Sequence, residues 1–307
     1  MRIVGDHVRV RVPATSANLG PGFDSMGLAL AHFDTIEVRA LGSPEVQVEV
    51  TGEGAGELPS GEDHLVVRAI RAALDAVGAP QVGLHLTCAN AIPHGRGMGS
   101  SAAAVVGGIL AVRMMINEPE ALYNTAAFRI AAEFEGHPDN AAPAILGGAT
   151  VSWTEEDGPH ATALPVHPDV VPVVLVPQER CATRTARGVL PDLVPHEDAA
   201  FTAGRAALLV QALCHRPELM FEATRDRLHQ EYRASVMPAT LSLVRDLRDV
   251  GQAAVVSGAG PSVLVLERAS DGDRGAQLRR EVLADRDERW TELVPGIATD
   301  GAEAVRL

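Results

Sequence analysis

The chain has 307 residues, a formal net charge of −14 at pH 7, and 46% hydrophobic against 21% charged residues, which are globular rather than disordered proportions. Every one of its 26 fixed positive charges is an arginine, because the sequence contains no lysine. The chemistries that need a lysine are therefore excluded, namely the P-loop, the protein kinases, and Schiff-base or pyridoxal-phosphate catalysis. A phosphate site in this chain has to use backbone N–H groups, helix dipoles, a metal ion and arginine.

The acidic balance argues against a nucleic-acid partner, because an acidic surface repels the phosphate backbone. Cys88, Cys181 and Cys214 form neither a metal-binding spacing nor a disulfide framework, which favours a reducing compartment. The N-terminal stretch MRIVGDHVRVRVP alternates apolar and charged residues, unlike a signal peptide, and the longest apolar run, 102–112, is too short to span a bilayer. We expect a cytoplasmic protein with no membrane partner.

Strands and helices are mixed along the first half of the chain. Period-two patterns predict strands at His7–Val12, Thr35–Val38, Glu45–Val50, Val82–Thr87 and Gly148–Trp153. Helical spacing of apolar residues predicts helices over Asp63–Val77, from Ser100 onward, and over 120–135. A loop expected over Thr154–Pro172 would contain a domain boundary near 155–170.

The second half predicts strands at Val173–Val176, Ala253–Ser257, Ser262–Leu266 and the C-terminus, and helices at about 198–214, 217–230, 238–249 and 274–285. The hairpin-like pairs and the irregular alternation favour an α+β fold over a doubly wound parallel sheet. We expect two domains, residues 1–160 and residues 161–307.

The segment Pro93–Ala103, PHGRGMGSSAA, combines alternate glycines with the start of a small-residue helix. Glycines let the backbone approach a ligand closely, and the free N–H groups of the helix then point at it, which is typical of a phosphate site. Ser101 could add a hydroxyl to a Mg²⁺ ion on the phosphates. A simple glycine-rich turn explains this segment equally well when it is taken alone.

Four further segments carry polar groups, and each also has a purely structural explanation. The loop 13–24 offers hydrogen-bonding side chains but also suits local turns. The turn within 255–263 by itself is best explained as a hairpin. Acids, His137 and Asn140 crowd a helix end at 133–140, where at most one of Glu133 and Glu135 faces a ligand, and one histidine without cysteine disfavours zinc. Arginines in 183–187 and 226–233 could clamp a carboxylate, although a surface role suits each one singly.

Taken together, PATSANLGPGFDSMGLAL, IPHGRGMGSSAAA and VSGAGPSVLVL resemble, in order and separation, the three signature motifs of the GHMP small-molecule kinases. The first of these, with EGHPDNAAPAILGG, TRTARGVLP and HQEYR, resembles the homoserine kinases more specifically. The resemblance spans almost the whole chain. It implies an α+β fold with a ribosomal-protein-like N-terminal domain, containing a left-handed βαβ crossover, and a ferredoxin-like C-terminal domain. The active site is implied to lie in the cleft between them.

The resemblance implies ATP-dependent phosphorylation of the hydroxyl of L-homoserine to O-phospho-L-homoserine, a step of threonine biosynthesis, with Mg²⁺. It assigns ATP to the segment containing Pro93, Gly95, Arg96, Gly97, Met98, Gly99, Ser100, Ser101, Ala102 and Ala103. It assigns the substrate to Asn18, Asp24, His137, Asn140, Thr183, Arg187, Arg233, Gly258 and Gly260. Ser101 and Glu135 resemble the Mg²⁺ ligands and, with Asn140, the catalytic set. The compact Glu-Gly-His spacing leaves the choice between Glu133 and Glu135 open.

The charges of homoserine agree with this assignment, because Asp24 can bind the ammonium group while Arg187 and Arg233 bind the carboxylate. Asn140 can orient the hydroxyl. No residue is a strong candidate for a general base, so we expect direct in-line transfer carried by positioning and charge neutralisation.

Three alternatives remain at this point: a GHMP kinase for another small alcohol, a catalytically silent sensor of ATP or an amino acid, and an α+β protein whose glycine-rich loops are only turns. The sequence leaves open whether the chain forms a homodimer.

Overall fold

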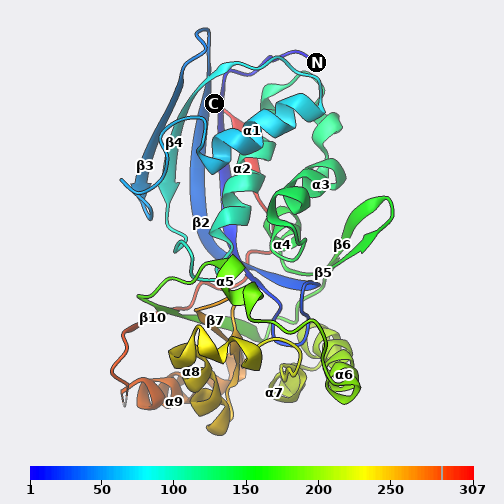
Figure 1. Cartoon of the computed structure of the whole chain (residues 1–307), viewed down its shortest axis with the longest axis vertical. Coiled ribbons are helices and arrows are strands. Elements are labelled where there is room, and N and C mark those ends of the chain that lie inside the picture. Colours follow the sequence, from blue (N-terminus) through cyan, green and yellow to red (C-terminus); the bar gives the residue numbers. More distant parts are fainter. Residues whose placement is uncertain (285) are drawn as a thin grey trace.

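The structure is a computed structural model that describes residues 1–284 and 286–307 (Figure 1). Within these residues the strands form a seven-stranded and a four-stranded sheet, one above the other in Figure 1. The larger sheet contains β1 (His7–Ala17), β2 (Met26–Leu41), β3 (Val46–Gly52), β4 (Gly83–Asn90), β5 (Ala149–Glu155), β6 (Gly158–Leu164) and β11 (Glu303–Arg306). The smaller sheet contains β7 (Val170–Pro177), β8 (Ala253–Val256), β9 (Val263–Arg268) and β10 (Trp290–Leu293).

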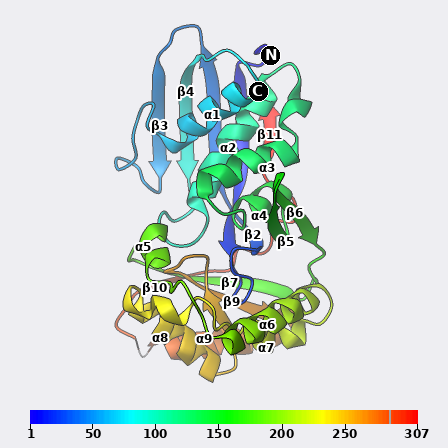
Figure 2. The ribbon, with the colours of Figure 1, turned by 45° about the vertical axis from the view of Figure 1, so that its right-hand side comes forward.

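The larger sheet has the order β11-β1-β2-β4-β3, and β5 pairs with both β2 and β6. Its pairings are antiparallel except for β3 and β4, which run parallel because α1 (Leu65–Ala76) connects them. The long strand β2 pairs with β4 near one end and with β5 near the other. Because β2 is long, it extends from the outer edge of the molecule to the junction with the smaller sheet (Figure 2).

The helices α1, α2 (Ser100–Met115), α3 (Asn124–Glu135) and α4 (Ala141–Leu146) cover one face of the larger sheet (Figure 2). Helix α2 is buried on most of its surface, because its small residues allow both neighbours to approach closely. A Cβ on Gly107 would lie 2.5 Å from Ile36 Cδ1 of the sheet, and one on Gly108 would lie 2.7 Å from the Val66 carbonyl oxygen of α1. This packing fixes α2 with its N-terminus directed at the junction between the sheets.

The smaller sheet has the order β10-β7-β9-β8 and is antiparallel throughout. Apolar residues of β7, β8, β9 and α8 (Pro238–Asp249) form a core of their own around Val265 and Leu247. The remaining helices of this half are α6 (His196–Cys214), α7 (Met220–Ala223) and α9 (Gly272–Ala284), and the short α5 (Thr183–Gly188) lies at the junction (Figure 1).

The predicted α+β class is confirmed, but several predicted elements are corrected. The expected loop over 154–172 contains β6, which pairs with β5, and the chain end returns as β11 to pair with β1. The larger sheet therefore contains residues from both sides of the predicted division at 160/161. The division of the chain into two domains at that point stays a prediction. The helix predicted over 217–230 stops at Ala223, because the Asp226 carboxylate accepts the backbone N–H groups of the three residues 228–230 and turns the chain. Helix α9 is present, and its predicted end at 285 lies outside the described residues.

None of the helices in the described part of the chain is both long and apolar enough to cross a membrane. Cys88, Cys181 and Cys214 are free thiols.

Candidate active site

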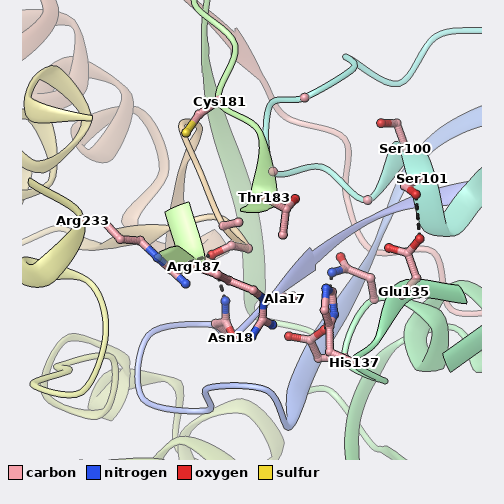
Figure 3. A pocket seen from close by; sticks show the side chains of 17 residues that line it. Ala17, Asn18, Ser100, Ser101, Glu135, His137, Cys181, Thr183, Arg187 and Arg233 are labelled. Carbon is pink, nitrogen blue, oxygen red and sulfur yellow. Dashed lines mark hydrogen bonds and ion pairs between the residues drawn. The ribbon is translucent and has the colours of Figure 1, made fainter. Parts of the chain in front are cut away.

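A polar cavity of about 110 Å³ lies between the two halves of the molecule (Figure 3). Its lining comes from six separate parts of the chain: Ala17, Asn18, Gly95, Gly97, Gly99, Ser100, Ser101, Glu135, His137, Asp139, Asn140, Cys181, Thr183, Arg187, Arg233, Gly258 and Ala259. Backbone and hydroxyl groups form one end, at the start of α2, and charged side chains form the other.

The loop before α2 is held by close contacts that only glycine allows. Gly97 has φ +70°, and a Cβ there would lie 2.2 Å from the Ser257 carbonyl oxygen. Gly99 also has φ +70°, and its Cβ would lie 1.9 Å from Thr15 Oγ1. The loop therefore packs against β1 and against the β8–β9 turn, and this brings the N-terminus of α2 to the cavity.

The first turn of α2 presents donors to this cavity. The first backbone N–H bonded within the helix is that of Ala103, which donates to the Gly99 carbonyl at 2.9 Å. The N–H groups of the three preceding residues have no acceptor of the helix's own, and the helix dipole adds positive potential there. This end of the cavity suits an anion, and phosphate above all.

Ser101 and Glu135 meet beside these N–H groups, as Figure 3 shows. The Ser101 hydroxyl donates to Glu135 Oε1 at 2.6 Å, whereas Glu133 is exposed on the same helix and does not line the cavity. Burial raises the pKa of the Glu135 carboxyl, and the hydrogen bond from Ser101 opposes that shift. A cation beside this partly buried carboxylate would be stabilised. The geometry thus favours Glu135 over Glu133.

Several residues predicted to contact ATP point elsewhere. The Arg96 side chain donates to the carbonyls of Pro177 and Gln178 at 2.9 Å each and so ties the loop to the end of β7. The side chains of the following residues are buried in the protein core: Met98, Ala102 and Ala103. Pro93 lines neither this cavity nor a second cavity that adjoins it and is described below. The backbone of the segment, and not these side chains, faces the cavity.

At the other end of the cavity Arg233 is only 1% exposed and, among the described residues, forms no ion pair. Its guanidinium donates to His229 Nδ1 at 2.9 Å and to the carbonyls of Gly258 and Ala186 at 3.2 and 3.3 Å. Burial, and next the nearby charge of Arg187, lower the pKa of Arg233 to about 10. Because no carboxylate among the described residues lies within ion-pair distance of this buried cation, a carboxylate entering the cavity would be favoured.

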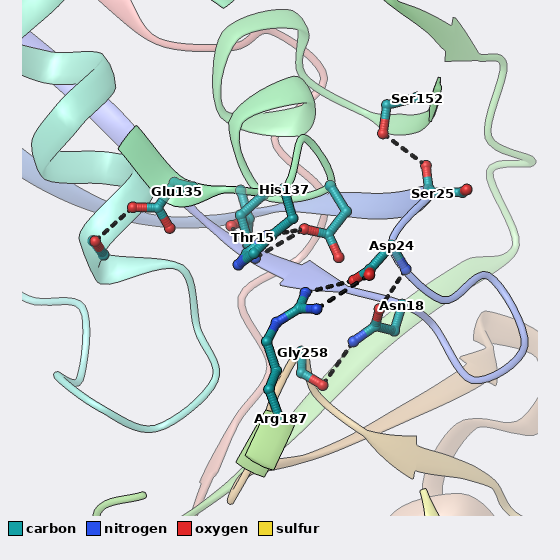
Figure 4. Close-up of polar contacts among 12 residues, drawn as sticks. Thr15, Asn18, Asp24, Ser25, Glu135, His137, Ser152, Arg187 and Gly258 are labelled. Atoms are coloured by element: carbon teal, nitrogen blue, oxygen red, sulfur yellow. Dashed lines mark hydrogen bonds and ion pairs between the residues drawn. The ribbon is translucent and has the colours of Figure 1, made fainter. Parts of the chain in front are cut away.

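Arg187 and Asp24 are paired with each other across the junction (Figure 4). The Arg187 guanidinium donates to both Asp24 carboxylate oxygens, at 2.5 and 3.1 Å, and each side chain is about one-third exposed. Burial lowers the pKa of Arg187, but the hydrogen bonds that it donates to Asp24, and the charge of that carboxylate, outweigh burial and raise the pKa. The two residues are 163 positions apart in the sequence, and their pairing joins the loop after β1 to α5.

A chain of hydrogen bonds holds the segment after α3. His137 Nδ1 lies 2.6 Å from Asp139 Oδ1, and Asp139 is 1% exposed. Burial lowers the pKa of His137, but the hydrogen bond and charge of Asp139 outweigh it, so that the pKa is raised. Asn140 accepts a hydrogen bond from Thr15 Oγ1 at 2.8 Å, which orients its amide at the cavity wall.

The other predicted substrate residues differ in position. Asn18 lies in the left-handed region at φ +69°, donates to the Gly258 carbonyl at 2.8 Å and accepts from the Asp24 N–H at 3.0 Å. Thr183 and Gly258 line the cavity. Gly260 does not, because its N–H donates to the Ser257 carbonyl and closes the turn.

Asp139, which lines the cavity, and Thr15, which contacts the cavity residue Asn140, were not among the predicted site residues. Asp139 was noticed only as one of several acids, although the His-x-Asp spacing was a signal that it supports His137. Thr15 was visible only as a hydrogen-bonding residue of a loop, and nothing local indicated that it would contact Asn140. The structure places Asp139 in the cavity lining beside His137 and brings Thr15 into contact with Asn140, which also lines the cavity.

A second, more apolar cavity of about 240 Å³ adjoins the first. Ser100 and Ser101 line both cavities, so the N-terminus of α2 separates them. The second cavity has polar groups from Asp34, Asn90 and His64, and the His64 side chain is buried with neither ring nitrogen hydrogen-bonded within the described residues. It suits a flat, largely apolar group that carries hydrogen-bonding edges.

Residues 64–148 match the family model described as the GHMP kinases N terminal domain. The fold agrees: a homoserine kinase structure from Cytophaga hutchinsonii aligns with a TM-score of 0.83 and 24% identity, covering 98% of each chain. A mevalonate diphosphate decarboxylase structure from Staphylococcus aureus aligns with a TM-score of 0.68 and 14% identity, again covering 98% of each chain. The two-sheet fold with a glycine-rich loop before α2 is that of the GHMP kinases.

Relatives that align over almost the whole chain identify the family within the GHMP kinases. A homoserine kinase of Clavibacter michiganensis is 50% identical over 300 residues, covering 97% of this chain and 94% of the relative. A homoserine kinase of Streptomyces coelicolor is 50% identical over 301 residues, covering 98% and 95%. The chain belongs to the homoserine kinase family, and the resemblance found in its motifs is confirmed.

Proposed function

We propose that the chain transfers the γ-phosphoryl group of ATP to the side-chain hydroxyl of L-homoserine, giving O-phospho-L-homoserine for threonine biosynthesis. The observation that carries this proposal is Arg233, a buried guanidinium without an ion-pair partner among the described residues, in the same cavity as the N-terminus of α2. One cavity thus offers a site for a carboxylate and a site for phosphate, and the family supplies the reaction class.

The two adjoining cavities support a placement for the nucleotide. The phosphates would lie at the N-terminus of α2, where Ser100 and Ser101 border both cavities. The base would occupy the second cavity beside His64. The γ-phosphate would then face the polar cavity and its amino-acid substrate.

Ser101 and Glu135 fit a Mg²⁺ ion. No group of three or more His, Cys, Asp or Glu residues suited to a metal occurs in the described part of the chain. Two oxygen ligands nevertheless suffice for Mg²⁺, which keeps its waters and takes further ligands from nucleotide phosphates. When bound, the ion would neutralise charge on the transferring phosphoryl group. The chain's part is to hold one hydroxyl and one carboxylate 2.6 Å apart beside the helix N-terminus.

The Asp24–Arg187 ion pair is matched to a zwitterion. When homoserine enters, its carboxylate can bind Arg233 and Arg187 while its ammonium group takes the place of Arg187 at Asp24. A substrate with only one of these charges would leave Asp24 or Arg187 without its partner in a partly buried place. The site thereby favours amino acids over simple alcohols and hydroxy acids.

The transfer itself needs no strong base in this scheme. Phosphoryl transfer has a loose transition state, so the substrate hydroxyl must chiefly be held in line with the γ-phosphate. Asn140, oriented by Thr15, would hold that hydroxyl, and His137, supported by Asp139, would add positive charge nearby. The hydroxyl proton would leave late, to phosphate.

The decisive experiment is ATP consumption by the purified chain with homoserine, serine, mevalonate and shikimate offered separately, and with product identified by mass. We expect turnover with homoserine and little with the others. Turnover only with an alcohol that lacks the amino-acid group would refute the proposal, and no turnover with any of them would favour a binding protein instead.

A further inference from the structure

A fully buried histidine, His229, lies directly behind the substrate end of the cavity. It follows the turn that ends α7, where the Asp226 carboxylate accepts the backbone N–H groups of residues 228, 229 and 230 at 2.9, 3.0 and 2.9 Å. Asp226 therefore holds the backbone of His229 in place independently of the contacts of the imidazole ring. Nothing in the proposed transfer uses this histidine.

Both ring nitrogens of His229 are engaged, and their partners determine the tautomer. Arg233 Nη1 lies 2.9 Å from Nδ1, and because a guanidinium only donates, Nδ1 must accept. The Gly20 carbonyl lies 2.7 Å from Nε2, and because a carbonyl only accepts, Nε2 must carry the proton. The imidazole is thus neutral and joins an arginine from one half of the molecule to the loop after β1 in the other.

The ring also supports that loop by packing. Phe23 stacks on His229 with the ring centroids 4.9 Å apart and the planes at 24°. The guanidinium carbons of Arg187 and Arg233 lie 5.6 and 6.0 Å from the centroid of the Phe23 ring. Gly20 and Phe23 thus enclose His229 on the loop that ends in Asp24.

We propose that His229 is a positioning residue for substrate binding: it holds Arg233 toward the cavity and fixes the loop carrying Asn18 and Asp24 in register with it. The neutral side chain of His229 thereby keeps a constant distance between Arg233, which would bind the substrate carboxylate, and Asp24, which would bind its ammonium group. This inference rests on the proposed function, since it concerns the two charges of an amino-acid substrate.

Charges face His229 from each side: Asp226 Oδ2 lies 3.7 Å from Nε2, Arg233 lies at Nδ1, and Asp24 is on the adjoining loop. Burial, the largest influence, lowers the pKa of His229, so the neutral form persists at neutral pH. Protonation would place an N–H on Nδ1 against the Arg233 N–H, and the hydrogen bond between them would be lost. We therefore expect any rise in the KM for homoserine that comes from protonation of His229 to appear only at pH values below the ordinary histidine pKa of 6.5.

Two substitutions separate the two hydrogen bonds. In His229→Asn the amide oxygen can stand where Nδ1 stands, which keeps an acceptor for Arg233 and loses the bond to Gly20. In His229→Gln the amide nitrogen can stand where Nε2 stands, which keeps the bond to Gly20 and loses the acceptor for Arg233. We expect His229→Gln to raise the KM for homoserine about tenfold and His229→Asn to raise it less, with the KM for ATP unchanged in both.

His215→Gln, at an exposed histidine, is the matched control and should behave as the unaltered chain. A KM for homoserine within twofold of the unaltered value in a folded His229→Gln variant would overturn the inference, as would a parallel rise in the KM for ATP. If neither variant folds, ring ¹⁵N NMR of the unaltered chain decides, since a His229 that carries a proton on Nδ1 at neutral pH contradicts the inference. An unaltered chain inactive on homoserine would instead overturn the proposed function itself.

Discussion

The two ends of the polar cavity are made of different parts of the polypeptide. At the start of α2, backbone N–H groups and one hydroxyl face the cavity, and the arginine of that loop is bound to carbonyls elsewhere. At the opposite end, the charged side chains of Arg233 and Arg187 line the cavity, and Asp24, which is outside the lining, holds Arg187 through an ion pair. The difference explains how a chain without lysine can bind phosphate, because a backbone site needs the right conformation and not a particular side chain. The amino-acid end, by contrast, depends on individual charges.

The largest expected effect is therefore at the side-chain end. We expect Arg233→Gln to raise the KM for homoserine about a hundredfold or more, because it removes the buried charge-assisted contact with the substrate carboxylate. The KM for ATP should change little, and steady-state kinetics with each substrate varied in turn measures both. Arg184→Gln, at an exposed arginine of α5, is the control. A similar KM for homoserine in both variants would place the carboxylate elsewhere.

At the backbone end, a change of conformation should matter more than a change of charge. In Gly99→Ala the new Cβ meets Thr15 Oγ1 at a residue with φ +70°, and we expect the KM for ATP to rise about tenfold as the loop shifts. Gly78→Ala is the matched control, because Gly78 has φ +63° but open space around its Cβ position. If both variants show the same modest loss of stability and normal kinetics, the loop does not depend on this close approach.

The proposed Mg²⁺ site at Ser101 and Glu135 can be tested by changing its carboxylate. We expect Glu135→Gln to raise the Mg²⁺ concentration for half-maximal activity about tenfold, because one charged ligand is lost beside Ser101. Glu133→Gln, on the same helix but exposed, should leave it unchanged. A Mg²⁺ titration at saturating ATP and homoserine measures the shift. The opposite pattern would show that the metal is bound through Glu133.

The smallest effect expected is a pH dependence of stability that comes from His137. Asp139 raises the pKa of His137 in the folded chain, so this pair stabilises the fold fully below the unfolded value of 6.5 and the contribution is lost as pH rises through the raised pKa. We expect a decrease of about 1 kcal/mol or less in the free energy of unfolding over that range. Urea unfolding across neutral pH measures it. In Asp139→Asn the decrease should vanish, and a decrease of equal size in that variant would assign it to another group.

Local patterns were informative about the backbone end. The glycines of 93–99 and the small residues after Ser100 predicted a loop followed by a helix, because glycine conformation and helical spacing are properties of a few consecutive residues. The helix predicted over 217–230 was wrong for a related reason. Helical spacing continues past Ala223, but the Asp226 side chain competes for the backbone N–H groups.

The sequence by itself determined the fold class, the family, the absence of any lysine-dependent route, and the segments that meet at the cavity. Only the tertiary structure decided that Asp24 pairs with Arg187, that Glu135 rather than Glu133 contacts Ser101, that Thr15 orients Asn140, and that the C-terminal strand joins the first sheet. Residue type and spacing limit what each segment can do within a turn or a strand. Which side chains become neighbours depends on packing between segments that, in these three side-chain contacts, are 34 to 163 positions apart, and no local pattern contains that information.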